Sequence, residues 1–230
     1  MITQNQIADA FGRATTDFSS SAALQKLLSG KSTPDEVREF ISNVCRTHLL
    51  SSHIVAFLYA SLPTKASELV KENLLEEMGH SEGGKAHSAL LLELAKGSGF
   101  NDKDIERLIH ESQQQIRLFF AQKITFPTLK DLCLSIMLET ESFEFLLSRC
   151  SSQIAKALRE HYKIPQPALH WFELHSEVDI RHAEEGLTII REYVSFHQID
   201  DARFEQILKA TFAKNVFLKR YFPSDAAVPS

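Results

Sequence analysis

Apolar residues recur at the spacing of an α-helix through almost the whole chain, and this pattern most constrains the fold. Strand-like alternation of apolar and polar residues never persists for more than a few positions. The 230 residues include 8 Gly and 7 Pro, so turn signals are sparse and the helices between them must be long. Long helices joined by short turns are typical of an antiparallel bundle, so the sequence predicts an all-α fold.

Turn and capping residues divide the chain into helical segments. Thr33 can cap a helix that has Pro34 in its first turn, and Glu36 completes a capping box. A chain of this length suits one domain over residues 1–222, and we expect the polar tail 223–230 to be disordered. The predicted helices cover 3–29 with a break near 19–21, 33–62, 64–79, 83–96, 101–122, 127–150 with a shorter helix to 162, 168–197 and 200–222.

Charge and composition exclude several classes of function. A formal net charge of −5 without any Lys/Arg-rich block argues against a nucleic-acid partner. No apolar run is long enough to span a membrane, and the first twenty residues do not read as a secretory signal. Cys45, Cys133 and Cys150 are odd in number and far apart, which favours neither a disulfide framework nor a thiolate zinc site. We therefore expect a cytoplasmic protein that acts on a small molecule, with a homodimer left open.

The segment from Trp171 to Gly186 carries the strongest chemical signal. His175, Asp179 and His182 fall on one helical stripe, because an α-helix turns about 100° per residue. Apolar residues share this stripe, so it faces the core, where an unpaired carboxylate is costly. A metal ion would satisfy all three groups. The alternative is that the histidines are ordinary core residues and that Asp179 pairs with Arg181 or a neighbouring helix.

Other helices offer further ligands on apolar stripes: Glu77, His87 and Glu141. Glu76 and His80 compete with Glu77 and His87, and Glu144 lies one turn after Glu141. Oxygen and imidazole ligands without a thiolate suit iron or manganese better than structural zinc. Sets of two histidines and one carboxylate on iron leave coordination positions open for dioxygen.

These residues resemble those of a known family. Glu76-Glu77-x-Gly79 followed by His87, then Glu141, then His175-x-Glu177-x-Asp179-x-Arg181-His182, are similar to the haem-oxygenase-like di-iron oxidases and oxygenases. The last block resembles most the CADD-like branch, named for the chlamydial protein associating with death domains. The similarity covers about residues 30–195, and the His-x3-Asp-x2-His block is its specific part.

The resemblance implies a bundle of about seven helices, the fold of the TenA and PqqC proteins, and two iron ions. It implies a di-iron oxidase or oxygenase that uses dioxygen to oxidise a small amino-acid-like or fatty-acid-like molecule. The ligands implied are Glu77, His87, Glu141, His175, Asp179 and His182. Glu76, His80, Glu144 and Tyr193 are candidates for positions around the metal or in the pocket.

Four alternatives stay open. One branch of the family makes para-aminobenzoate from its own tyrosine, but Leu24 and Ser151 stand where that branch has its tyrosine and lysine, and Tyr193 would be the substitute. A TenA-like hydrolase of thiamin fragments would use Cys133 as its nucleophile. A non-catalytic interaction protein and a metal-storage protein are the other two. If a substrate carboxylate is bound, Lys85 and Arg149 are candidate anchors, although both read more readily as surface residues.

Overall fold

The computed structural model describes residues 3–80, 84–121 and 126–223, and the side chains of 118–121 and 177–183 also lie outside the described part. Within those ranges the regular structure is helical, as predicted. Its elements are α1 (Gln4–Ser19), α2 (Ala22–Leu28), α3 (Pro34–His48), α4 (Ser51–Ser61), α5 (Thr64–Glu77), α6 (His87–Gly97), α7 (Asp102–Ala121), α8 (Leu129–Tyr162), η1 (Gln166–Leu169), α9 (His170–Phe196), α10 (Asp201–Thr211) and α11 (Val216–Tyr221).

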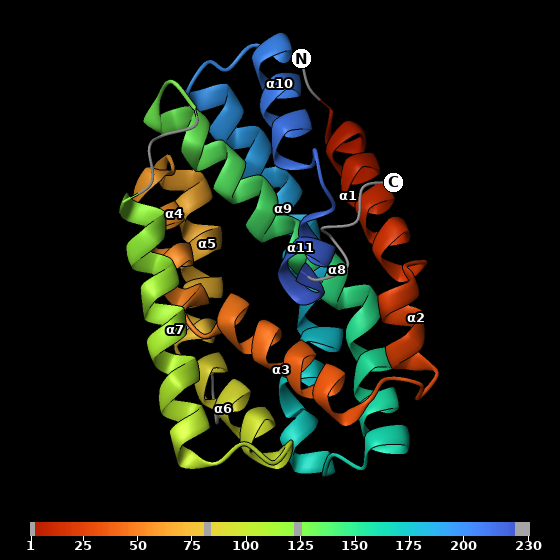
Figure 1. Ribbon diagram of the computed structural model, residues 1–230. Coiled ribbons are helices and arrows are strands. Elements are labelled where there is room, and N and C mark those ends of the chain that lie inside the picture. Colours follow the sequence, from red (N-terminus) through yellow and green to blue (C-terminus); the bar gives the residue numbers. More distant parts are fainter. Residues whose placement is uncertain (1–2, 81–83, 122–125, 224–230) are drawn as a thin grey trace.

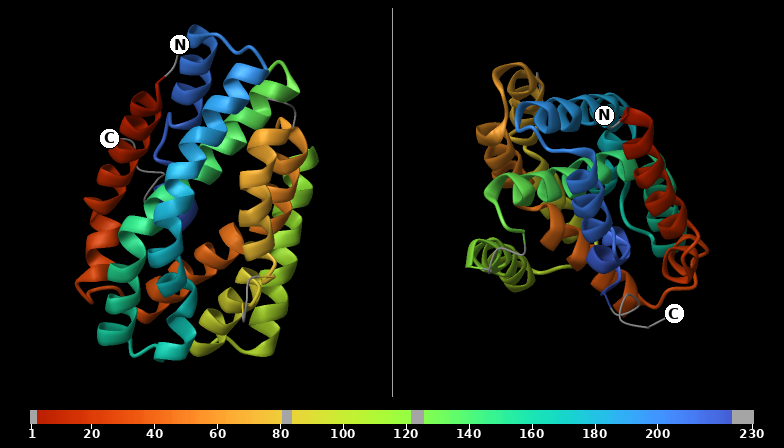
Figure 2. Two further views of the ribbon diagram at one scale, coloured as in Figure 1. Left: turned by 180° about the vertical axis from the view of Figure 1, so that it is seen from behind. Right: turned by 90° about the horizontal axis from the view of Figure 1, so that it is seen from above.

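The helices α8 and α9 form the centre of the bundle and make its most extensive helix–helix contact. Their connection through η1 is short, so the two helices run antiparallel (Figure 2). Helices α4, α5, α6 and α7 lie on one side of this pair, and α1 and α2 lie on the other (Figure 1). Helix α3 crosses between the two groups, so residues on its last turn can reach the middle of the molecule.

Several helix boundaries follow the predicted signals. Thr33 caps α3 through its hydroxyl, which accepts from the Glu36 amide at 3.3 Å, while the Glu36 carboxylate accepts from the Thr33 amide at 2.8 Å. The predicted break near 19–21 is confirmed, because Ser21 caps α2. These local hydrogen bonds satisfy amides that a helix start leaves without a partner.

Other boundaries were predicted wrongly. The helix expected over 33–62 divides at Leu49 and Leu50, where an unbroken apolar pattern hides the turn. The helix expected from 83 begins at His87, and the last one divides at Asn215, whose side chain caps α11. The break expected at Cys150 is absent, and α8 runs unbroken for 34 residues. The hydroxyl of Ser148 donates to the carbonyl of Phe145 within this helix.

The core consists of two apolar clusters built on α8 and α9. Among the described residues, the buried acidic and imidazole side chains are Glu77, His87, Asp131, Glu141, Glu144 and His175. All six lie on α8, α9 and the facing ends of α5 and α6. Asp131 pairs with Arg203, and the other five define the site described below. The helices that the structure describes include none long and apolar enough to cross a membrane.

Candidate metal centre

Three buried side chains from three helices meet at one point. Glu77 is the last residue of α5, His87 is the first residue of α6, and His175 lies in the second turn of α9. One ligand atom from each lies within 4.8 Å of the other two. The Nδ1 atom of His87 is 3.1 Å from Oε1 of Glu77, and the rings of His87 and His175 have centroids 4.8 Å apart. Two imidazoles and a carboxylate in this arrangement form a donor set suited to iron.

The environment of Glu77 calls for a cation. Its side chain is 6% exposed, and a buried carboxylate is costly unless it is paired. Glu77 also ends α5, where the helix dipole adds negative charge. The hydroxyl of Ser51 donates to Oε2 and orients the carboxylate, while Oε1 faces His87. A metal ion between these groups would balance the negative charge that the helix end and the carboxylate share.

The tautomer of His175 is fixed by its own helix. Nδ1 lies 2.7 Å from the carbonyl oxygen of Trp171, and a carbonyl can only accept, so Nδ1 carries a proton. Burial lowers the pKa of His175 to about 4, helped by His87 and opposed by Glu144 and Glu77. The ring is therefore neutral at pH 7, and its Nε2 presents a lone pair. Metal-binding histidines commonly have this arrangement, with the second nitrogen held by a backbone carbonyl.

Glu141 approaches α9 farther along the helix. Its side chain is 4% exposed, and its carboxylate packs against Gly186, where a side chain would overlap it. Gly186 lies four residues after His182, so the Glu141 carboxylate sits beside the part of α9 that carries His182. The side chains of Asp179 and His182 themselves lie outside the described residues. Their backbone belongs to α9, one and two turns after His175 on the same helix face.

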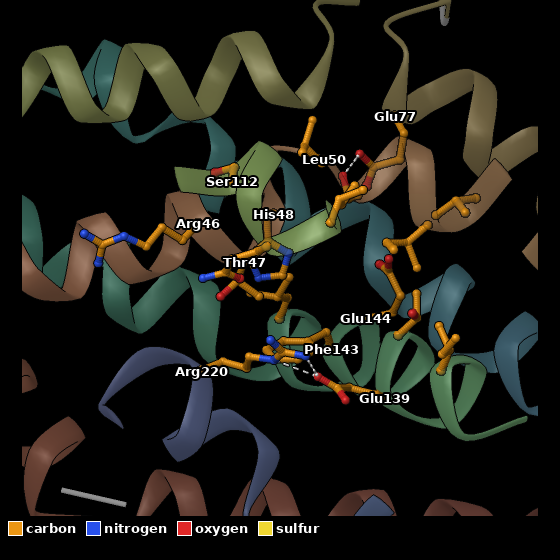
Figure 3. Close-up of a pocket in the computed structure, with 18 of the residues that line it drawn as sticks. Arg46, Thr47, His48, Leu50, Glu77, Ser112, Glu139, Phe143, Glu144 and Arg220 are labelled. Atoms are coloured by element: carbon orange, nitrogen blue, oxygen red, sulfur yellow. Dashed lines mark hydrogen bonds and ion pairs between the residues drawn. The ribbon is translucent and has the colours of Figure 1, made fainter. Parts of the chain in front are cut away.

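A cavity of about 170 Å³ opens beside the cluster, and Glu77, Glu144 and His175 line it. Figure 3 shows Glu77 and Glu144 on one side of this cavity, and Arg46 and Arg220 on the opposite side. Apolar side chains cover much of the wall: Leu50, Ile54, Val55, Ile116, Ile136, Phe143 and Leu147. The cavity therefore joins a polar end, where the candidate metal ligands lie, to a largely apolar interior.

Burial distinguishes Glu77 and His87 from the two residues that compete with them as ligands. Glu77 and His87 are buried, whereas Glu76 is half-buried and His80 is exposed. Tyr193 was a candidate pocket residue, but the structure places it elsewhere. Its hydroxyl donates to the carbonyl of Lys130 at 2.9 Å, and it lies about 27 Å along α9 from His175, given 1.5 Å per residue.

Three charged residues of the cavity wall were not identified from the sequence. Arg46, Arg220 and Glu139 line it. Glu139 lies nearly opposite Glu141 around the helix, and this position predicted that it is exposed. The expected anchors are surface residues instead. Lys85 pairs with Glu93, and the guanidinium carbon of Arg149 lies 3.4 Å from the centre of the Phe145 ring rather than in the cavity. The sequence carries no local signal for Arg46 or Arg220, because their placement depends on how α3 and α11 cross α8.

Cys133 does not behave as a nucleophile in this structure. Its side chain is 2% exposed, and burial raises the pKa of its thiol, so the reactive thiolate is disfavoured. Among the described residues that line the cavity beside His175, Cys133 is absent. It packs instead with the apolar residues between α8 and the later part of α9.

Comparison with known proteins agrees with this geometry. Residues 38–211 match the sequence family of iron-containing redox enzymes, a haem-oxygenase-like group. The crystal structure of a TenA homologue from Pseudomonas syringae pv. tomato superposes with a TM-score of 0.65 over 95% of this chain and 92% of that one, at 14% identity. This likeness supports the fold alone. No curated protein matches the sequence significantly.

Proposed function

Because the chain belongs to the family of iron-containing redox enzymes, we propose that it is a di-iron oxidase or oxygenase acting on a small organic molecule. The proposed ligands are Glu77, His87, Glu141, His175, Asp179 and His182. Two bound ferrous ions would supply the electrons that reduce dioxygen. Manganese is the alternative metal, because the same oxygen and imidazole ligands suit both.

The observation that carries this proposal is the state of His175. Its Nδ1 donates a hydrogen bond to the Trp171 carbonyl, so Nε2 carries the lone pair that can bind a metal. Glu77 and His87 lie beside this ring and can complete the ligand set. A core histidine that only filled space would not need two further ligating groups beside it. The buried, neutral ring, the carboxylate at a helix C-terminus and the second imidazole together form an arrangement that a metal ion stabilises.

The chain's own residues also prepare the cavity for a substrate. Apolar side chains from α4, α7 and α8 cover its wall and limit the water near the cluster, which protects a reactive centre from side reactions. Glu144 lies on this wall with a 7% exposed side chain. It is placed between the cluster and the apolar space, where a carboxylate can accept a proton or serve as an additional oxygen ligand.

The test is metal content after anaerobic purification and ferrous reconstitution, compared between two variants on the same helix. His175→Ala should lose iron, whereas His170→Ala should keep it, because His170 is exposed five residues earlier on α9. Asp179→Ala and His182→Ala should also lose iron while the helical circular dichroism signal is retained. Binding of two irons per chain with oxygen consumption supports the proposal, and full iron in His175→Ala refutes the ligand assignment.

A hydrolase of the TenA kind is the alternative that the fold permits. It would need a nucleophile in the cavity, and the buried Cys133 lies elsewhere. The same preparations can be assayed without metal for hydrolysis of aminopyrimidine substrates. Hydrolysis that requires Cys133 and not His175 would replace the oxidase proposal.

A further inference from the structure

The cavity beside the cluster has a directional distribution of charge. Glu77 and Glu144 stand at one end, and Arg46 and Arg220 stand at the other (Figure 3). His175 belongs to the end of Glu77, with which it forms the cluster. The cavity volume of about 170 Å³ would hold roughly six water molecules, at about 30 Å³ for each as in liquid water. A molecule of that size with an apolar body and one anionic group would match the walls along the whole cavity.

Arg220 is held at the cavity by a short C-terminal helix. Its neighbour Tyr221 is fully buried, with its hydroxyl 2.7 Å from Nε2 of His48 and its carbonyl 3.2 Å from the Asn43 side-chain nitrogen. These two bonds tie α11 to α3, and they thereby fix the position of Arg220 at the cavity. Helix α11 lies beyond residues 38–211, the part that matches the family, so this arginine lies outside the matched segment.

The guanidinium of Arg220 has donors left for a ligand. Its Nε and Nη2 both contact Oε1 of Glu139, at 2.8 and 2.6 Å. The structure's described part supplies no acceptor for Nη1, which carries two more N–H donors. The two side chains are 38% and 28% exposed, and such an accessible ion pair holds its partners only weakly. A second carboxylate can therefore bind Arg220 beside Glu139.

Among the described residues, Arg46 is held by acceptors from two helices, whereas Arg220 is held by Glu139 alone. Its Nε donates to Glu111 at 2.6 Å, and its Nη1 donates to the side chain of Asn43 at 2.8 Å. It contributes positive potential to this end of the cavity while its own donors are directed toward α7 and α3. Of the two cations on the wall, Arg220 is more readily available to a bound molecule, because one accessible carboxylate is its partner.

We propose that Arg220 is a specificity-determining residue that binds the carboxylate of a small, otherwise apolar acid. This inference rests on the proposed function, because oxidation at the proposed metal centre would act on the apolar body of the acid. That body would extend toward Glu77 and His175. An arginine fork recognises a carboxylate in two parallel hydrogen bonds, which fixes the direction of the molecule as well as its charge. The end of the acid remote from its carboxylate is thereby presented to the metal-binding cluster.

The test uses 3-phenylpropanoate and its uncharged amide, 3-phenylpropanamide, as probes of equal shape. Binding to the full chain is measured by calorimetry, both without metal and after manganese loading. We expect the acid to bind at least about tenfold more tightly than the amide, the size expected for hydrogen bonds to a charged group. Arg220→Gln should remove this preference, and Lys219→Gln, which removes an exposed charge from the same helix, should leave it intact.

Two further variants separate recognition from folding. Arg220→Lys keeps the charge and the pair with Glu139 but not the fork, so the acid should bind at an intermediate strength. Glu139→Gln removes the competing carboxylate and should strengthen binding of the acid. Equal affinity for acid and amide, or an unchanged preference in Arg220→Gln, overturns the proposal. Because the metal-free protein is included, these outcomes do not depend on whether iron is bound.

Discussion

Replacing Gly186 by alanine should stabilise the helix but displace the carboxylate of Glu141. A Cβ at position 186 would lie 2.9 Å from Cδ and 3.2 Å from Cβ of Glu141, and closer still to Oε2. Ordinary contact begins at 3.4 Å, so the carboxyl carbon must move by about 0.5 Å and its oxygen by more. Metal–ligand distances tolerate only about ±0.2 Å, so we expect Gly186→Ala to lose this ligand.

The same substitution favours the helix, because alanine in a helix interior is about 1 kcal/mol more favourable than glycine. The free energy of unfolding of the metal-free protein should therefore change by less than about 1 kcal/mol, while iron content falls. Gly12→Ala is the matched control: nothing lies within 4 Å of its added Cβ, so α1 should gain stability and iron should be unaffected. Chemical denaturation and iron analysis measure the two effects. Iron binding equal to wild type in Gly186→Ala would refute the placement of Glu141 as a ligand.

Three further substitutions test neighbouring features. Ser51→Ala removes the hydroxyl that orients Glu77 and should weaken manganese binding roughly 10- to 100-fold by titration; unchanged affinity would contradict that role. Cys133→Ser should leave oxygen consumption unchanged because its thiol is buried with a raised pKa, and a loss of activity would point to thiol chemistry. Burial lowers the pKa of His48 from 6.5 to about 3; Glu144 opposes this shift, and Arg220 and His87 add to it. The unfolded chain therefore takes up this proton first, which lowers stability below about pH 6.5, by at most about 2 kcal/mol at pH 5. Urea unfolding at pH 7.5 and 5 should show a smaller pH dependence in His48→Gln, and an equal dependence would show that His48 is not responsible.

The bundle could be predicted because helical periodicity is a local property that α8 and α9 carry over many turns. Polar residues on the apolar faces of these two helices, such as His175 and Glu141, could be identified for the same reason. The break between α3 and α4 could not be seen, because Leu49 and Leu50 continue the apolar pattern and no Gly or Pro marks the turn. The unbroken α8 was missed because the serines near Cys150 resemble a turn in sequence, although the helix continues through them and Ser148 hydrogen-bonds to the carbonyl of Phe145 within it.

The cavity could not be predicted from the sequence, and the reason is a different one. Arg46 and Arg220 are separated by most of the chain and belong to helices that cross α8 at separate points. Each alone reads as an ordinary surface cation, and their shared role arises only from packing. The tautomer of His175 also required coordinates, although the Trp171 carbonyl lies four residues earlier, because the direction of the ring decides whether Nδ1 reaches it.

The ligands of the proposed centre are supported by backbones of unequal rigidity. His175 and Glu141 stand in the interiors of α9 and α8, whose mutual packing is the most extensive in the bundle, whereas Glu77 ends α5 and His87 begins α6, and those two helices touch each other little. Helix ends open at a lower free energy than helix interiors. Parting α5 from α6 would remove two ligands while α8 and α9 stay together, so an ion held between them can leave without global unfolding. We therefore expect metal exchange to be faster than unfolding, with the ion bound at the helix ends the first to leave and the last to load.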